Sequence, residues 1–127
     1  MSRRVIETSK APLPVGTYSQ AIVSGDLLFS AGQIALDPRT GEMVNQSFRA
    51  EVKQIFYNLQ AVLSAASLTL ADVVKYTVFM TDLSQFGEVN EIFSEYYQKA
   101  PPARSAVQVS ALPKGATIEI ECIASLK

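Results

Sequence analysis

The sequence predicts an α+β domain in which two helices pack on one face of a mixed β-sheet. Two segments repeat apolar residues at spacings of three and four, which is the pattern of amphipathic helices. The other patterned segments are shorter, rich in β-branched and aromatic residues, and bounded by Gly, Pro and Asp turns, which is typical of strands. Each helix is long enough to connect parallel strands. No linker or internal repeat interrupts the pattern, so residues 1–127 are expected to form a single domain.

The first half of the chain predicts three strands and a helix. A short strand is expected over 4–7, a second over 18–24 and, after a Gly-Asp turn signal, a third over 27–36. Turn residues at 37–41 end the third strand. Over 47–68 the apolar residues follow helical spacing with a broad buried face, so this segment is the first helix.

The second half predicts a strand over 73–81, a helix over 83–97 and a C-terminal hairpin. Asp82, with Gln85 three residues later, is the expected N-cap of the helix. Apolar and polar residues then alternate on both sides of a Leu-Pro-Lys-Gly turn at 112–115, which predicts two strands paired with each other.

The predicted sheet has one face without a helical cover. Both alternating residue sets of the strands 27–36 and 73–81 are nevertheless largely apolar. Burial of this face in a homo-oligomer is the favoured explanation, and a moderately apolar face in contact with solvent is the alternative.

Composition and charge narrow the classes of function. The net charge is −1, the isoelectric point is about 5.4, and Arg3-Arg4 is the largest basic cluster, so nucleic acid is not expected as a partner. Cys122 is the single cysteine and cannot form an intramolecular disulfide. The N-terminal residues contain neither a secretory signal nor a membrane-length apolar run, so a cytoplasmic protein without a membrane partner is expected.

The chain contains no histidine. This removes the usual general base near neutral pH and the Ser-His-Asp and Cys-His nucleophilic systems, and it leaves few ligands for a transition metal. Any catalysis is therefore expected to use carboxylates, Arg, Tyr, hydroxyls, backbone groups and water, with no metal.

Charged residues in the C-terminal hairpin are candidates for a site. In a hairpin centred on 112–115, Arg104 would lie near the far end of the strand that contains Glu119 and Glu121, which project from one face. Three interpretations remain open from spacing alone: a solvated cross-strand ion pair, an arginine clamp for a ligand carboxylate with a glutamate that handles a proton or water, or pairing at a subunit interface.

Four blocks of sequence carry a resemblance to a known family. PPARSAVQVSALPKGATIEIECIA, GTYSQAI, FSAGQIALDPRTGE and VVKYTVFMTDLSQFGEVNEIF resemble the motifs of the reactive intermediate deaminase (RidA/YjgF-type) family, with the same order and spacing over 16–124. The resemblance implies a chorismate-mutase-like fold and a barrel-like homotrimer with sites between subunits. It also implies hydrolysis of enamines and imines, such as 2-aminoacrylate/2-iminopropanoate and 2-iminobutanoate, to 2-keto acids and ammonia without a cofactor.

The same resemblance assigns roles to individual residues. Arg104 would bind the substrate carboxylate, and Glu119 would orient or deprotonate the attacking water, which leaves Glu121 as the structural member of the pair. The remaining motif residues would line the substrate cleft; they are Tyr18, Gly32 and Asn90.

Two substrate-binding positions depart from the common family pattern. Ala31 stands where many members have a serine, so a hydroxyl contact to the substrate carboxylate is missing unless Ser30 or a water replaces it. Ala106 stands where many members have cysteine or threonine; its backbone carbonyl can still accept a hydrogen bond from the substrate nitrogen.

Two other functions compete with imine hydrolysis. A regulatory module that binds 2-keto acids or related carboxylates without turnover would keep Arg104 and not need Glu119. An endoribonuclease or translation inhibitor is disfavoured because the chain is acidic and lacks a basic stripe.

Overall fold

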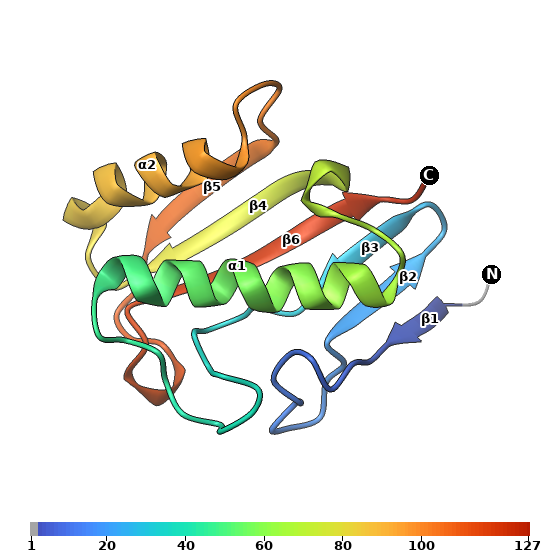
Figure 1. Cartoon of the computed structure of the whole chain (residues 1–127), viewed down its shortest axis with the longest axis horizontal. Coiled ribbons are helices and arrows are strands. Elements are labelled where there is room, and N and C mark those ends of the chain that lie inside the picture. The colour runs from blue at the N-terminus through green and yellow to red at the C-terminus, as the bar shows by residue number, and fades with distance from the viewer. Residues whose placement is uncertain (1–2) are drawn as a thin grey trace.

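Six strands form one sheet, and two helices lie across one of its faces (Figure 1). The structure is a computed structural model that describes residues 3–127. The elements are β1 (Arg3–Ile6), β2 (Ala21–Ser24), β3 (Leu27–Ser30), α1 (Phe48–Ala65), β4 (Val73–Met80), α2 (Phe86–Tyr96), β5 (Ala103–Gln108) and β6 (Ile118–Ser125). The strand order is β1-β2-β3-β6-β4-β5; β4 and β5 are parallel, and the other neighbours are antiparallel. The predicted α+β class and mixed sheet are confirmed.

A polar side chain caps α1, and another caps the short turn that precedes α2. The Ser47 side chain accepts a hydrogen bond from the backbone N–H of Ala50 at 3.0 Å, which satisfies an unpaired donor at the start of α1. Asp82 caps a short 3₁₀ turn (Leu83–Gln85) through the N–H of Ser84, and α2 starts after it. The predicted helix over 83–97 is thus split into a turn and a helix, and Asp82 caps the turn.

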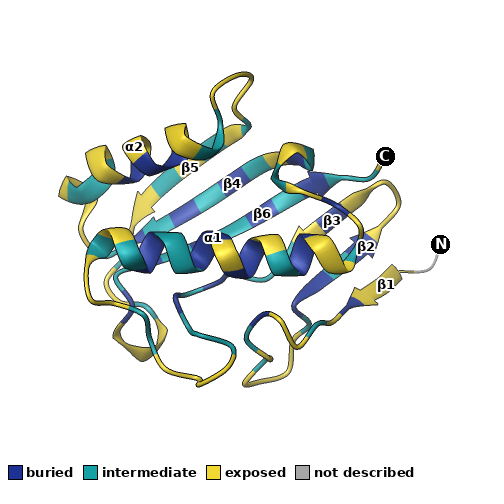
Figure 2. Cartoon of the chain, viewed as in Figure 1, coloured by how far each residue is buried: buried dark blue, intermediate teal, exposed yellow. Residues whose placement is uncertain are grey.

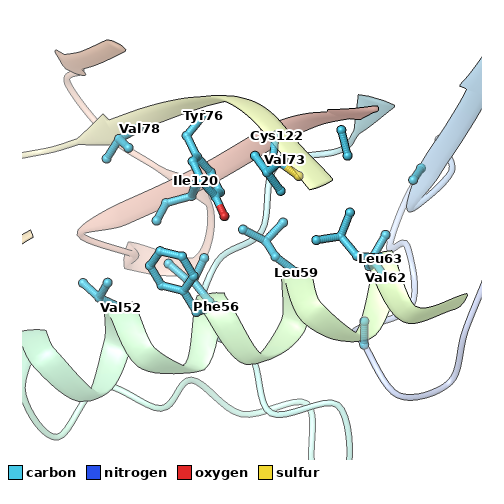
Figure 3. Close-up of a cluster of buried hydrophobic side chains, with 14 of the residues drawn as sticks. Val52, Phe56, Leu59, Val62, Leu63, Val73, Tyr76, Val78, Ile120 and Cys122 are labelled. Carbon is cyan, nitrogen blue, oxygen red and sulfur yellow. The ribbon is translucent and has the colours of Figure 1, made fainter. Parts of the chain in front are cut away.

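The core lies between α1 and the central strands β4 and β6 (Figures 2 and 3). The buried stripe of α1 places Phe56 and Leu59 against Tyr76 of β4 and Ile120 of β6. Phe56 meets Tyr76 edge to face, with ring centroids 5.9 Å apart. This packing fixes α1 over the middle of the sheet and leaves the opposite sheet face uncovered.

The predicted C-terminal hairpin is wrong, because β5 and β6 are not neighbours. β4 lies between them: Arg104 of β5 is opposite Tyr76, whereas Glu119 of β6 is opposite Phe79. The Leu-Pro-Lys-Gly segment does turn, with Lys114 in the left-handed region, but it connects strands on either side of β4. From Tyr76 to Met80, β4 alternates buried and partly exposed residues, so it stabilises the sheet best from a central place, and the shorter, more exposed β5 occupies the edge.

The predicted strand over 27–36 ends early, at Ser30. Beyond it, Gln33 forms an isolated bridge to Ile120, with N···O distances of 2.8 and 3.1 Å. The buried side chain of Asn58, from α1, donates to the carbonyls of Ile34 and Leu36 at 3.2 and 2.9 Å. A side chain thus replaces a neighbouring strand as hydrogen-bond partner here. The strand predicted over 18–24 likewise begins only at β2.

Apolar side chains are exposed on the sheet face that the helices leave uncovered. Phe29 and Val107 belong to this face. Their partners on the neighbouring strands are Ile123 and Phe79. The residues directly before and after each partner are buried under the helices, so the partners themselves face the other way. No helix within residues 3–127 is long and apolar enough to span a membrane.

Candidate active site

A pocket of about 340 Å³ opens at the ends of β3 and β6. We call it the Glu119 pocket. Its wall contains one carboxylate and one ammonium, from Glu119 and Lys114, among mostly apolar groups. Three of the residues that the sequence assigns to the substrate cleft also line it, namely Tyr18, Ala31 and Gly32.

Gly32 makes room for the Glu119 side chain. A methyl group added at Gly32 would lie 2.8 Å from Cδ of Glu119 and closer still to Oε2, so any larger residue would displace the carboxylate. The bridge between Gln33 and Ile120 holds the backbone directly after both Gly32 and Glu119. The glycine therefore fixes where the carboxylate can lie.

The environment of Glu119 favours its neutral form. Burial raises the pKa of the Glu119 carboxyl above its ordinary value, and the nearby charge of Glu121 raises it further. A partly buried carboxylate with a raised pKa is a suitable proton acceptor near neutral pH, because its basicity is closer to that of the water it would activate.

A buried glutamine holds the outer wall of the Glu119 pocket. Oε1 of Gln20 accepts the N–H of Thr8 at 2.7 Å, and Nε2 donates to the carbonyls of Thr8 and Pro12 at 3.0 and 2.8 Å. These bonds tie the segment before β2 to the sheet, which places Pro12 and Leu13 in the pocket wall.

Arg104 lines a second pocket, of about 300 Å³, between β5 and α2. We call it the Arg104 pocket. The guanidinium lies over the rings of Phe86 and Phe93, 4.9 and 4.7 Å from their centroids, and Nη2 donates to Oδ1 of Asn90 at 2.8 Å. Aromatic stacking and one amide contact orient the planar group, so its remaining N–H donors are arranged for a ligand.

Arg104 has no carboxylate partner among residues 3–127, where the ion pairs involve other cations. Burial lowers its pKa, but a guanidinium stays protonated in proteins. A partly buried, unpaired and oriented arginine is suited to binding a carboxylate in a bidentate manner.

The two pockets lie on opposite faces of the sheet. Arg104 is opposite Tyr76, which is buried under the helices, so it belongs to the helix face. Glu119 alternates with the buried Ile118 and Ile120 and belongs to the uncovered face. The expectation that the hairpin brings Arg104 and Glu119 together within one chain is therefore wrong, whereas the shared face of Glu119 and Glu121 is confirmed.

Of the two residues that depart from the family pattern, one lies in the Glu119 pocket and the other lies on the strand that carries Arg104. Ala31 lines the Glu119 pocket, and the neighbouring Ser30 accepts the N–H of Cys122 at 2.9 Å through its hydroxyl oxygen. That contact directs the Ser30 side chain toward β6, and Ser30 is not among the residues that line the Glu119 pocket. Ala106 is opposite Val78 in β5 and therefore shares the helix face with Arg104.

Several contributors to the site are absent from the sequence-based assignment. Phe86 and Phe93 read as ordinary core positions of a helix, and only the β5 placement shows that they stack on Arg104. Gln20 follows the GTY motif and is a polar residue at the start of an apolar strand. This position in the sequence could have predicted that its side chain is buried and hydrogen-bonded. Within residues 3–127, no cluster of three Cys, Asp or Glu side chains could hold a metal ion.

Comparison with known proteins places these features in a family. The family described as Endoribonuclease L-PSP matches residues 8–126. The 2-iminobutanoate/2-iminopropanoate deaminase of Rattus norvegicus is 48% identical over 122 residues, which cover 96% of this chain and 89% of that protein. The structure of RidA from an Antarctic Psychrobacter species superposes with a TM-score of 0.92 at 46% identity, covering 97% and 99% of the two chains. Escherichia coli TdcF with bound serine gives a TM-score of 0.88 at 38% identity, covering 98% and 99%. The chain therefore belongs to the Endoribonuclease L-PSP family, which is the YjgF/RidA family that its motifs resemble.

Proposed function

We propose that this protein hydrolyses 2-aminoacrylate/2-iminopropanoate and 2-iminobutanoate to the corresponding 2-keto acids and ammonia. The observation that carries the proposal is the pair of half-sites: a carboxylate with a raised pKa in an open pocket, and an oriented arginine without a carboxylate partner among the described residues. A 2-imino acid needs both, because it combines a carboxylate to be held with an electrophilic carbon to be attacked by water. The name of the rat relative supports the same reaction.

The proposed reaction needs few groups because the imine carbon is already electrophilic. Arg104 binds the substrate carboxylate, and Glu119 accepts a proton as water adds to the carbon of the C=N bond. With the imine nitrogen protonated, this addition gives a carbinolamine. Glu119 returns its proton to the nitrogen, ammonia leaves, and the hydroxyl proton passes back to Glu119 as the C=O bond of the 2-keto acid forms. The other predicted contacts are Tyr18, Gly32 and Asn90, with the carbonyl of Ala106 as acceptor for the substrate nitrogen.

We propose that the two half-sites meet between protomers of a homotrimer. In one chain, Arg104 and Glu119 lie on opposite faces of the sheet. They are two strand spacings, about 10 Å, apart across it and offset by three residues along it, because their partners on β4 are Tyr76 and Phe79. A neighbouring protomer that covers the open face would bury apolar side chains such as Phe29 and Val107. It would also bring its own β5 edge, with Arg104, toward the Glu119 pocket.

A carboxylate-binding module without turnover is the second candidate, and the bound serine of TdcF supports a small ligand with a carboxylate. A ribonuclease is not proposed despite the family description. Nucleic-acid binding draws on many free cations. Within residues 3–127, ion pairs with carboxylates engage four of the eleven lysines and arginines, namely Arg39, Arg49, Lys53 and Lys127.

The test is the disappearance of the imine when purified protein is added to a serine or threonine dehydratase reaction. Wild-type protein should accelerate the loss, and Arg104→Ala should lower kcat/KM about 30-fold to several-thousand-fold, since an unpaired charge-assisted contact costs about 2–5 kcal/mol. Arg39→Ala is the matched control, because Arg39 forms an exposed ion pair with Asp37 outside both pockets. Binding of 2-keto acids without any acceleration would instead favour the binding module.

A further inference from the structure

A buried carboxylate lies in the first turn of α1, outside both pockets. Glu51 is only 3% exposed. Its Oε2 accepts the backbone N–H of Thr117 at 2.9 Å, and its Oε1 accepts the hydroxyl of the same residue at 2.6 Å. No lysine or arginine within residues 3–127 forms an ion pair with it. Thr117 is therefore the main partner of this carboxylate.

The local structure surrounds the Glu51 carboxyl group with hydrogen-bond donors and with the start of a helix. The unpaired N–H groups at the beginning of a helix give that end a partial positive charge, which stabilises an acidic residue in the first turn. Hydrogen bonds to an ionised carboxylate are roughly twice as strong as bonds between neutral groups. Removing the carboxylate would leave the N–H and the hydroxyl of Thr117 without this acceptor.

Thr117 is also fixed from the other side. Its carbonyl accepts the N–H of Thr81, just after β4, at 3.1 Å. Thr117 directly precedes β6, and Glu119 is two residues further along. The next residue, Ile120, exchanges two backbone hydrogen bonds with Gln33. The short segment that carries Glu119 is thus held at both ends, by Glu51 before it and by Gln33 after it.

Small displacements of this segment matter because the Glu119 carboxyl lies against the backbone of Gly32. We propose that Glu51 is a positioning residue for the deaminase: through Thr117 it fixes the start of β6 and thereby holds the Glu119 carboxylate against Gly32. The inference rests on the proposed function for its kinetic consequence, but the placement of Glu119 can be measured without any reaction.

The kinetic expectation follows from the fact that Glu51 lines neither pocket and acts only through the position of Glu119. A misplacement of about 1 Å in a reacting group can cost about 100-fold in rate. We therefore expect Glu51→Ala to lower kcat about 10- to 100-fold while KM changes less than about threefold, because Arg104 binds the substrate elsewhere.

Two milder variants separate positioning from a loss of folding. In Glu51→Gln the amide oxygen can accept the N–H of Thr117 and the amide nitrogen can donate to its hydroxyl oxygen, so activity should be largely retained. Thr117→Val keeps the N–H contact and removes the hydroxyl contact, so its kcat should be intermediate. Arg49→Ala is the control for general weakening of this helix turn, because Arg49 pairs with Glu95 on the exposed side; it should leave kcat unchanged.

The direct readout is the pKa of the Glu119 carboxyl, followed by carbon-detected NMR titration. The other titratable groups near it are Glu121 on the same strand and Tyr18 and Lys114 in the pocket wall. In wild-type protein the pKa is raised mainly by burial. If Glu51→Ala releases the carboxyl into solvent, the pKa of Glu119 falls toward its ordinary value, whereas Glu51→Gln and Arg49→Ala leave it raised.

A double-mutant comparison completes the test. If Glu51 acts through Glu119, adding Glu51→Ala to Glu119→Gln should cost no further activity. Full additivity would overturn the proposal, as would wild-type kcat and an unchanged Glu119 titration in Glu51→Ala and Thr117→Val. If Glu51→Ala does not fold, Thr117→Val decides by the same two measurements. If wild-type protein hydrolyses no imine, the proposed function fails, and the titration alone still decides whether Glu51 places Glu119.

Discussion

Two inactive variants are expected to restore activity to each other when their protomers are mixed. Arg104→Ala removes the group proposed to bind the substrate carboxylate, and Glu119→Gln removes the proposed proton acceptor. Because the two side chains lie on opposite faces of one sheet, a small substrate cannot contact both in a single chain. If each site combines Arg104 of one protomer with Glu119 of its neighbour, a mixed trimer can contain an intact site.

The size of the restored activity follows from counting. In an equal mixture, the protomer that supplies the arginine has a one-in-two chance of being the Glu119→Gln variant, which keeps Arg104. Its neighbour has the same chance of being the Arg104→Ala variant, which keeps Glu119. About one quarter of all sites in a randomly mixed cyclic trimer are then intact, so activity should reach about 25% of the wild-type value.

The assay measures imine loss in the dehydratase reaction before and after protomer exchange. Exchange is verified by mass spectrometry with one variant isotopically labelled, and each variant passed alone through the same procedure is the control. If verified mixed trimers remain as inactive as the separate variants, the reasoning that places the site between protomers is refuted.

Three further predictions concern single residues. Gly32→Ala should lower kcat about 100-fold, because the added methyl group would overlap the Glu119 carboxyl; steady-state kinetics beside an unchanged circular dichroism spectrum would check this. Glu119→Gln should raise the melting temperature by a few degrees at neutral pH and have little effect near pH 4. A carboxyl group whose pKa is raised in the folded state contributes stability below its ordinary pKa, and this stability is lost as pH rises through the raised value, so the charged form of Glu119 destabilises the fold. Calorimetry at both pH values tests this. Leu59→Ala should lower the free energy of unfolding by about 2–5 kcal/mol, measured by urea denaturation, since Leu59 is fully buried between α1 and the sheet.

The spacing of apolar residues predicted helices and strands well where one face of the element is buried. The helix expected over 47–68 is observed as Phe48–Ala65, and the strand expected over 73–81 as Val73–Met80. In both, the apolar spacing reports which side chains meet the core, and burial of those side chains is what stabilises the element.

The pairing of strands could not be predicted in the same way. Alternation in β5 and β6 reports which face each side chain occupies, but the partner of a strand depends on contacts with distant residues. A short turn between two alternating segments favoured a hairpin, whereas β4 enters between them and pairs with both. That single error placed Arg104 and Glu119 side by side, whereas each of them lines a different pocket.

Buried polar residues were overlooked although the helix contains a signal for them. Glu51 and Asn58 fall at spacings of three and four from Phe48 and Ile55, so they lie on the apolar stripe of α1. A polar residue at such a position must find hydrogen-bond partners when the stripe is buried. The sequence can indicate that need, but the partners, Thr117 and the carbonyls near Leu36, are known only from the fold.

The division of charge between the pockets suggests that catalysis depends on assembly. In an isolated protomer, the Glu119 carboxylate repels an anionic substrate whenever Glu119 is ionised, and the single ammonium in the same wall, from Lys114, leaves the pocket without a net positive charge. The arginine that would offset this repulsion lies on the other face of the same chain. A neighbouring protomer that supplies it would make the pocket attractive to the substrate only in the assembled protein. Under the proposed function, dilution below the dissociation range of the trimer should therefore raise KM and lower kcat together, even for protomers that remain folded.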